Sequence, residues 1–258
     1  MKVSIITVAY NSAETIRDTI ESILSQTYGN IEYIVVDGQS QDGTLDIIRE
    51  YESAGKGNLI FISEPDKGIY DAMNKGIRLA TGDVVGTLNS DDFFTSDDVI
   101  SQVVQAFGQD ESLEAVYGDV HYVKADNLNK CIRYYSSRFF RRGLLRFGYV
   151  PAHPSLYCRK EVFEKYGLYD LQYKTSSDFD MMLRLFGVHR IKAKYIGVDC
   201  VTMRVGGETS SGVSSIRRIN RDLTRSLKSH GIYSNQFFHF VRYMWKVCEL
   251  IYSKFRYF

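Results

Sequence analysis

The chain has 258 residues, enough for one large α/β domain or for a core domain with a smaller appendage. Hydrophobic residues make up 44% and charged residues 24%, which are the proportions of an ordinary globular protein. The net charge of +1 argues against a general nucleic-acid-binding protein, and we expect no nucleic-acid partner.

The first hundred residues alternate between strand and helix patterns. Short apolar runs between turn residues predict buried strands at residues 3–8, 31–36, 59–63 and 84–88. Apolar positions at helical spacing predict helices at residues 16–24, 45–51 and 69–79. Strand–helix repetition of this kind predicts a parallel sheet with right-handed crossovers.

The second half is less regular. A helix is predicted at 99–107, and Gly118-Asp119 separates two strand patterns, 115–117 and 120–123, as in a hairpin or a bent strand. Residues 129–150 are basic and aromatic without a clear period, and we interpret them as a loop or a cover segment. Further on we expect a strand at 156–158, helices at 161–166 and 179–186, an extended segment at 191–204 and a loop at 206–212.

The C-terminal region is predicted to be helical at 216–229 and again from Gln236. In the second helix the polar residues recur three or four positions apart, at His239, Arg242, Lys246, Glu249, Ser253 and Arg256. Nearly all its other positions are apolar or aromatic. Such a helix can pack on the protein core, form a dimer interface or lie in a membrane surface, and its basic flanks favour the last of these.

The strand at 84–88 ends in Asn89-Ser90-Asp91-Asp92. In an α/β sheet, ligands bind at the carboxyl ends of parallel strands, so this is where chemistry is expected. Two adjacent carboxylates suit Mg²⁺ or Mn²⁺, which also bind a substrate phosphate. Ser and Asp are equally good helix N-caps, so this segment alone leaves a metal site and a helix cap equally open.

Other polar residues are predicted at the same edge of the sheet. Asp37 follows the strand at 31–36 beside Gly38, and we favour a ligand contact for it over an Asx turn. Asp42 is more simply a helix cap. Lys67 precedes the helix at 69–79, where a cation and a helix N-terminus suit a diphosphate or a ribose.

Two further groups lie in the second half. Asp178 and Asp180 stand at the start of the predicted helix 179–186, where a carboxylate can cap the helix or take a proton from an alcohol. His153 lies between Pro151 and Pro154, and a lone histidine is more often structural than a ligand, so its role stays open.

Three segments, Val3–Asn11, Ile34–Thr44 and Leu88–Asp92, resemble the family 2 glycosyltransferases with the GT-A fold, of the type found in bacterial polysaccharide biosynthesis. The resemblance is strong over about the first 100 residues and continues to Leu185. It implies an α/β, Rossmann-like nucleotide-sugar-binding fold, with a mixed, mostly parallel sheet flanked by helices and an amphipathic C-terminal tail. The implied divisions are a catalytic domain at 1–215, split into a nucleotide-sugar-binding half (1–100) and an acceptor half (101–215), and a helical docking segment at 216–258.

The resemblance also implies roles for single residues. Asp178 matches the family's catalytic base, and Asp91 would be the main ligand of a Mn²⁺ or Mg²⁺ ion that bridges the donor diphosphate. Asn89 replaces the first Asp of the family's Asp-x-Asp motif, and Ser177 stands where a Glu often precedes the base. The expected donor contacts are Thr7, Ala9, Tyr10, Asp37, Lys67, Asn89, Ser90 and Asp92. The expected metal, diphosphate or acceptor contacts are His153, Asp180 and Arg204, with the loop at Gly206-Gly207 closing over the phosphates.

The implied function is inverting transfer of a sugar from a nucleotide-diphosphate donor to a hydroxyl of a saccharide or lipid-linked saccharide. Met1-Lys2 leads directly into a strand, too short for a signal peptide, so we expect a cytoplasmic protein. The tail at 231–258 would place it peripherally at the inner face of the membrane. Whether it forms an oligomer stays open. The alternative function is a catalytically silent, membrane-docked nucleotide-sugar-binding or assembly protein on the same fold, because of Asn89 and the tail.

Overall fold

The computed structural model describes residues 1–55, 58–205 and 212–256, and of residues 212–216, 236, 239 and 250–256 it describes the backbone alone. Within these residues one sheet holds nine strands in the order β3-β2-β1-β4-β8-β6-β9-β5, with β7 paired to β6. The strands are β1 (Val3–Ala9), β2 (Ile31–Asp37), β3 (Asn58–Ser63), β4 (Val84–Thr87), β5 (Phe93–Phe94), β6 (Ala115–Lys124), β7 (Asn127–Tyr135), β8 (Leu156–Arg159) and β9 (Ala193–Val205).

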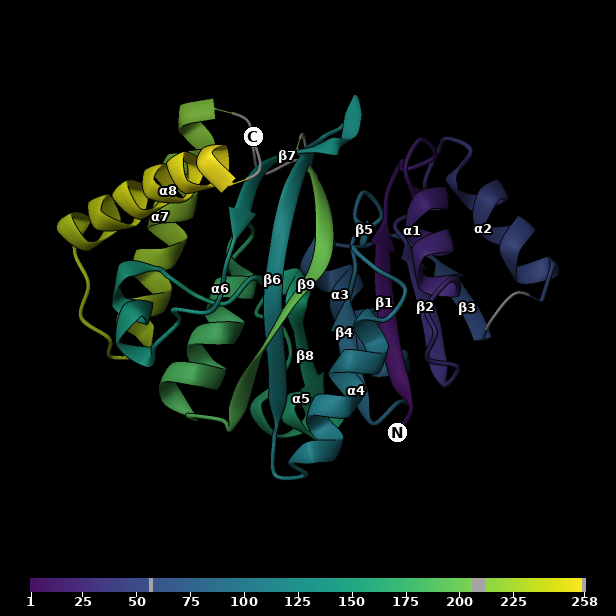
Figure 1. Ribbon diagram of the computed structural model, residues 1–258, viewed down its shortest axis with the longest axis horizontal. Helices are drawn as coiled ribbons and strands as arrows, with labels where there is room; N and C mark the ends of the chain where they lie inside the picture. The colour runs from purple at the N-terminus through teal and green to yellow at the C-terminus, as the bar shows by residue number, and fades with distance from the viewer. Residues whose placement is uncertain (56–57, 206–211, 257–258) are drawn as a thin grey trace.

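Helices cover both faces of this sheet (Figure 1). One face is covered by α1 (Ile16–Leu24), α2 (Thr44–Ser53) and α4 (Val99–Gln109). The other is covered by α3 (Ile69–Leu79), α5 (Lys160–Tyr166), α6 (Ser177–Met182) with its π-helical continuation η3 (Leu183–Val188), and α7 (Gly212–Ser229). The short helices η1 (Arg142–Phe147) and η2 (His153–Ser155) and the long α8 (Gln236–Arg256) complete the fold.

The parallel first half predicted from the sequence is confirmed. β1 lies between β2 and β4, and β3, β2, β1 and β4 all run in the same direction. All seven residues of β1 are buried, and its side chains alternate between the two helix layers: Ile5 points to one core and Ile6 to the other. A strand buried on both faces explains the continuous apolar runs in the sequence.

The second half of the sheet is mixed. β8 is antiparallel to both β4 and β6, whereas β6 and β9 are parallel. β6 is a single strand whose register against β9 shifts near Gly118, so the bent-strand interpretation is correct and the hairpin one is wrong. A Cβ atom at Gly118 would lie 2.4 Å from the Val198 carbonyl oxygen, so only glycine permits this approach of the two strands.

The segment 129–150 differs from the sequence prediction. Its first part is not a loop: β7 (Asn127–Tyr135) forms a hairpin with β6. None of the β7 residues is fully buried, so the strand lacks the clear apolar alternation by which strands are recognised. The rest of the segment contains η1 and does cover the sheet, as expected. The loop predicted at 206–212 falls almost entirely on residues 206–211, which lie outside the described residues.

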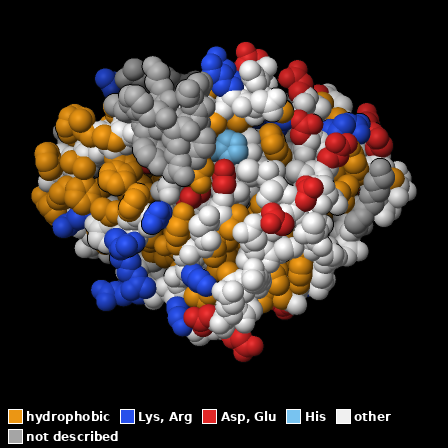
Figure 2. All heavy atoms as spheres, viewed as in Figure 1, with side chains coloured by type: hydrophobic (Ala, Val, Ile, Leu, Met, Phe, Trp, Pro, Cys, Tyr) orange, Lys and Arg blue, Asp and Glu red, His pale blue; other side chains and the backbone are white. Residues whose placement is uncertain are grey.

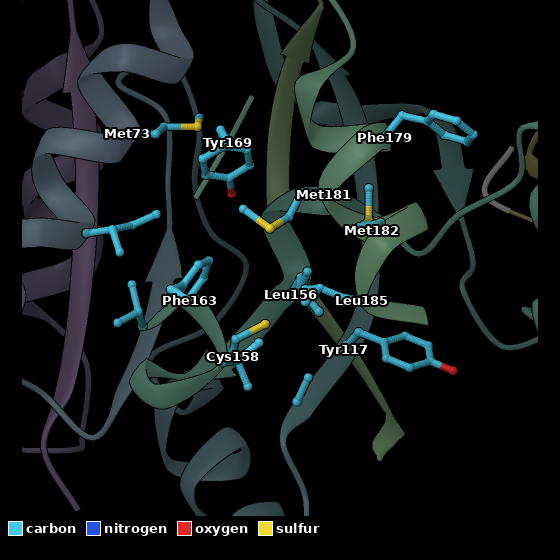
Figure 3. Close-up of a cluster of buried hydrophobic side chains, with 14 of the residues drawn as sticks. Met73, Tyr117, Leu156, Cys158, Phe163, Tyr169, Phe179, Met181, Met182 and Leu185 are labelled. Carbon is cyan, nitrogen blue, oxygen red and sulfur yellow. The ribbon is translucent and has the colours of Figure 1, made fainter. Parts of the chain in front are cut away.

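The core between α3 and α6 joins the two halves of the chain. Three side chains point toward one another in this core: Met73 of α3, Met181 of α6, and Tyr169 from the segment between α5 and α6 (Figure 3). Leu156 and Cys158 of β8 pack below them. Because this core is closely packed, the start of α6 is held at a fixed position relative to α3.

The C-terminal helix α8 packs on the rest of the chain. The Phe238 ring lies 4.8 Å from the ring of Phe147 in η1, and Arg242 donates a hydrogen bond to Asn220 of α7. Figure 1 shows α7 and α8 together at one end of the molecule, with α1 and α2 at the other. No helix among the described residues is both long and apolar enough to cross a membrane.

Candidate active site

The carboxyl ends of β1 and β4 form the edge at which a ligand is expected. The chain leaves β1 toward β2 on one side, while β4 lies on the other, so the connections diverge at this point. The loop after β1 and the loop after β4 meet there through a hydrogen bond of 2.8 Å between the hydroxyls of Ser12 and Ser90. Thr19 of α1 also donates to the Asp92 carbonyl oxygen at 2.6 Å.

Tyr10 is the exposed aromatic residue of this edge. Its side chain is 63% exposed, directly after the buried Ala9 and three residues after the buried Thr7. A Cβ atom at Gly38 would lie 3.3 Å from the Tyr10 ring and 2.6 Å from Asp66 Oδ2, so the glycine lets both side chains approach the backbone. Thr7 and Ala9 therefore support the surface from beneath, and Tyr10 is the residue that presents a free ring face.

Asp37 is completely buried at the end of β2. Its carboxylate accepts hydrogen bonds from the Ser40 backbone N–H and hydroxyl and from the Ser63 hydroxyl, the last at 2.7 Å. The Asx turn, which the sequence ranked second, is therefore present. Asp37 holds the 38–40 loop against β3, beside Tyr10.

Asp91 and Asp92 do not cap a helix. They precede the short strand β5, and the next helix, α4, begins only at Val99 with Asp98 as its N-cap residue. The helix-cap interpretation is therefore wrong. Burial raises the pKa of Asp91, and burial together with the Asp91 charge raises the pKa of Asp92 well above its usual value.

Arg204 of β9 links this carboxylate pair to α1. Its guanidinium donates to the Asp91 carbonyl oxygen at 2.7 Å and pairs with the Asp18 carboxylate, and its backbone N–H donates to Asp92 Oδ1 at 3.2 Å. Arg204 therefore lies beside the carboxylate pair, and its contact with a metal, a diphosphate or an acceptor stays a prediction. Its guanidinium is largely buried and occupied by protein partners.

The carboxylate pair fits a divalent cation. Asp92 Oδ2 is buried and has no hydrogen-bond partner among the described residues, and Asp91 beside it is desolvated. A buried carboxylate oxygen without a donor is costly unless a cation or its water satisfies it. No group of three His, Cys, Asp or Glu side chains suited to a metal occurs in the described part of the chain, so other ligands would come from substrate and water.

Asp178 lies in the first turn of α6, half-buried. Its Oδ1 accepts a hydrogen bond of 2.8 Å from the hydroxyl of Tyr70, in the first turn of α3. The Tyr70 ring lies 5.6 Å from the Tyr169 ring, whose hydroxyl is 2.6 Å from His153 Nε2. Burial lowers the pKa of His153, which favours the neutral imidazole in this network.

Tyr122 of β6 lies within electrostatic range of carboxylates from the β4 strand end and from α6. Tyr122 of β6 is desolvated, and its pKa is raised by burial and by the charges of Asp92 and Asp178. Each carboxylate is therefore close enough to Tyr122 to act on it electrostatically. The hydrogen bond from Tyr70 at the start of α3 also brings Asp178 to the edge of the sheet at which Asp91 and Asp92 lie.

The remaining sequence-predicted residues have other environments. Asp180 is buried and accepts hydrogen bonds from Arg184, from Ser226 at 2.7 Å and from His230 at 3.0 Å. Asp180 thus connects α6 to α7, and a contact of its carboxylate with a metal, a diphosphate or an acceptor stays a prediction. Lys67 is exposed just before α3, and Asn89 is half-buried beside Asp92.

Sequence reasoning missed two contributors to this site: Tyr70, which donates a hydrogen bond to Asp178, and Asp18, which pairs with Arg204. Tyr70 lies at helical spacing with Met73 and Ile77, so its pattern is that of a core residue. Its partner comes 108 residues later, and only the tertiary structure joins them.

The profile of the family described as Glycosyl transferase family 2 matches residues 4–167, well over half of the chain. The chain belongs to this family. A Mycobacterium bovis protein named PGL/p-HBAD biosynthesis glycosyltransferase is 32% identical over 196 residues, which are 76% of this glycosyltransferase and 73% of the relative.

Solved structures confirm the GT-A fold of the glycosyltransferase. S. aureus TarS 1-349 in complex with UDP superposes with a TM-score of 0.66 at 16% identity, covering 90% of this chain and 67% of TarS 1-349. The mannosyltransferase PcManGT from Pyrobaculum calidifontis, in complex with GDP-Man and Mn²⁺, gives a TM-score of 0.64 at 22% identity, with coverages of 88% and 63%.

Proposed function

We propose that this glycosyltransferase moves a sugar from a nucleoside-diphosphate donor to a hydroxyl of a saccharide or lipid-linked saccharide, with inversion at the anomeric carbon. The observation that carries the proposal is the 2.8 Å hydrogen bond from Tyr70, which joins Asp178 to the start of α3 at the carboxyl edge of the parallel strands, the edge that also carries the Asp91–Asp92 pair. An acceptor base and a diphosphate site must lie on either side of the reacting carbon, and this arrangement supports that requirement. Structural neighbours bound to UDP and to GDP-Man support a nucleotide-sugar donor.

The donor is proposed to lie along the carboxyl ends of β1, β2 and β4. The exposed Tyr10 ring offers a face on which a nucleobase can stack, and Asp37 keeps the adjoining 38–40 loop in place. Lys67 and the start of α3 supply positive potential for the diphosphate. Asn89 and Ser90 complete the donor side next to the carboxylates.

A Mn²⁺ or Mg²⁺ ion is proposed to bind at Asp91, with Asp92 beside it. When bound, such an ion offsets the charge that develops on the departing nucleoside diphosphate. The unpartnered Asp92 Oδ2 supports this assignment, as does the Mn²⁺ in the mannosyltransferase neighbour. Arg204 adds a fixed positive charge next to the pair.

The chemical step is proposed to begin at Asp178. Its carboxylate takes the proton of the acceptor hydroxyl, and the hydroxyl oxygen forms a bond to the anomeric carbon. The bond from that carbon to the diphosphate oxygen breaks on the opposite face, which inverts the configuration. Tyr70 donates to Oδ1 and leaves Oδ2 as the oxygen that receives the proton.

The proposed division of labour follows the chain. Residues 1–100 bind the donor, residues 101–215 supply the base and the acceptor surface, and residues 216–258 attach the protein peripherally to the inner face of a membrane. The two catalytic parts share one sheet and one core, which supports a single catalytic domain, and α7 packs on the same core through Leu223 and Leu227.

A panel of nucleotide sugars assayed with Mn²⁺ tests this function. We expect release of nucleoside diphosphate from one donor of the panel, with faster release when an acceptor is added. The catalytically silent alternative predicts nucleotide-sugar binding by calorimetry without turnover of any donor. That result, repeated with lipid extract as the source of acceptor, would reject the enzymatic proposal.

A further inference from the structure

Helix α8 presents its polar side to the protein. Arg133 of β7 pairs with Glu249 at 2.7 Å, and the two side chains are only 18% and 11% exposed. Arg242 donates to Asn220 Oδ1 at 2.9 Å. Burial, with Arg242 and Arg133 nearby, lowers the pKa of Lys246 to about 8. The polar stripe of this amphipathic helix therefore faces inward.

The opposite side of α8 carries large apolar side chains that face solvent. They are Phe237 (66% exposed), Phe240 (59%), Met244 (51%) and Val247 (48%). Figure 2 shows hydrophobic side chains gathered at the end of the molecule where Figure 1 places α8. A helix of a monomeric soluble protein normally buries its apolar side, so this reversed orientation indicates that the α8 apolar face meets a further surface.

The surroundings of the α8 apolar face are cationic. Arg138, Arg141, Arg142 and Arg146 are exposed on the adjoining η1 segment, and the Arg146 guanidinium lies 5.1 Å from the Phe238 ring. Figure 2 shows Lys and Arg side chains next to the hydrophobic group. Glu249, the acidic residue of α8, points inward and pairs with Arg133.

We propose that the α8 apolar face and the arginines of the η1 segment bind an anionic lipid surface. This inference rests on the proposed function, which includes peripheral attachment to a membrane. It names the face of the protein that binds and the charge of the lipid that is required. Aromatic and apolar side chains enter the headgroup boundary, while the adjoining arginines pair with lipid phosphates. A second copy of the chain fits less well, because a twofold interface would bring the same arginines of both copies together.

The docking face lies beside the acceptor half of the site. Arg133, which holds Glu249, stacks over the Tyr122 ring at 5.1 Å, and Tyr122 is the residue influenced by both Asp92 and Asp178. An acceptor anchored in the bound lipid surface would thus approach from the side of α8. This favours a lipid-linked over a freely diffusing saccharide acceptor.

Flotation of the full chain with vesicles tests the docking face. We expect the protein to float with vesicles of phosphatidylcholine and phosphatidylglycerol and to stay largely free with phosphatidylcholine alone. Phe237→Ser combined with Phe240→Ser should weaken binding at least about tenfold. Leu79→Ser combined with Val188→Ser removes exposed apolar surface elsewhere and should bind as the unaltered protein does.

A second variant tests the proposal even if the substitutions at Phe237 and Phe240 disturb α8. Arg138→Glu combined with Arg141→Glu leaves α8 intact and should also abolish flotation with the anionic vesicles. Flotation that is equal for all variants, or absent for the unaltered protein, would overturn the proposal. If light scattering shows a dimer, and if Phe237→Ser combined with Phe240→Ser dissociates it, the face would instead bind a second copy of the chain.

The binding assay contains no donor, so its outcome is separate from the catalytic proposal. In the absence of vesicles, the variant with Phe237→Ser and Phe240→Ser should release nucleoside diphosphate from a donor at the rate of the unaltered protein. Loss of lipid binding with turnover retained concerns the docking face alone. A protein that floats normally but turns over no donor would contradict only the catalytic proposal.

Discussion

Asp178 is held by a hydroxyl that comes from the donor-binding part of the chain. Burial and the Asp178 charge raise the pKa of Tyr70 well above its usual value, so its hydroxyl keeps its proton and donates at neutral pH. A hydrogen bond to a charged group contributes roughly 1.5–3 kcal/mol. Tyr70 is therefore a positioning residue for the proposed base.

Replacing Tyr70 by Phe should reduce kcat about tenfold and leave the donor Kd unchanged, because only the orientation of Asp178 is affected. Steady-state kinetics and donor calorimetry measure the two quantities. Tyr166→Phe is a matched control, since the Tyr166 hydroxyl also donates to a carboxylate, Glu114, away from the site. An unchanged kcat in the Tyr70 variant would show that the hydrogen bond has only a structural role.

Asp91 is the residue on which the proposed metal site depends. Asp91→Asn removes the charge that attracts the cation, and we expect Mn²⁺ to bind at least about tenfold more weakly in the presence of a nucleoside diphosphate. Isothermal titration of Mn²⁺ measures this affinity. Asp98→Asn, an exposed carboxylate on the same segment, should leave it unchanged. Equal Mn²⁺ affinities of the Asp91 variant and the unaltered protein would remove Asp91 from the metal site.

The acidic residues of the site could be predicted from the sequence because the ends of buried strands can be recognised there. Asp91 and Asp92 follow a buried apolar run, and that pattern places them at the ligand-binding edge. Asp180 shows the limit of this reasoning. It lies two residues after Asp178, and helical geometry turns the two side chains to different neighbours, Tyr70 of α3 and Ser226 of α7.

At the scale of elements, Glu32 connects β2 to β1 and to the segment before β4 through hydrogen bonds. The proposed donor site lies at the carboxyl ends of these strands. Its buried carboxylate in β2 accepts hydrogen bonds from Lys2 at 2.6 Å, from Ser4 of β1 and from the Thr81 backbone N–H before β4. Burial alone would raise its pKa, but the hydrogen bonds from Lys2, Ser4 and Thr81 lower the pKa to about 2. The ionised form is thus favoured in the folded state.

A lowered folded-state pKa gives stability that is fully present above the unfolded-state pKa and is lost as pH falls through the folded-state pKa. We expect Glu32→Gln to lower the free energy of unfolding by about 2–3 kcal/mol at pH 7. The difference should shrink between about pH 5 and about pH 2. Urea unfolding across this range measures it, with the exposed Glu50→Gln as control. A difference that does not change with pH would assign the effect to packing.

Elements were predictable where burial is complete and less so where it is partial. β1 and β2 are buried on both faces and appear in the sequence as continuous apolar runs. β7 is exposed from Asn127 to Lys130 and half-buried from Cys131 to Tyr135, so neither an apolar run nor alternation marks it. It exists as a strand because β6 pairs with it and α8 covers it, and both causes are tertiary.

At the scale of the whole molecule, the sequence identified an amphipathic C-terminal helix without indicating which side faces the protein. The 3.6-residue period defines two sides but not their surroundings. In the structure Arg133 of β7 supplies a partner for Glu249, and this buried pair turns the polar side inward. Helix α8 therefore packs on η1, α7 and β7, and the apolar side that it leaves exposed is the docking face that we propose.

The joint action of both halves on one anomeric carbon is the central claim, and turnover of Asp178→Asn tests it most directly. Asparagine keeps the shape of the side chain but cannot accept a proton. With the donor found active in the panel, we expect an unchanged donor Kd and sugar transfer that is slower by at least about a hundredfold. Transfer by Asp178→Asn at close to the rate of the unaltered enzyme would contradict the account.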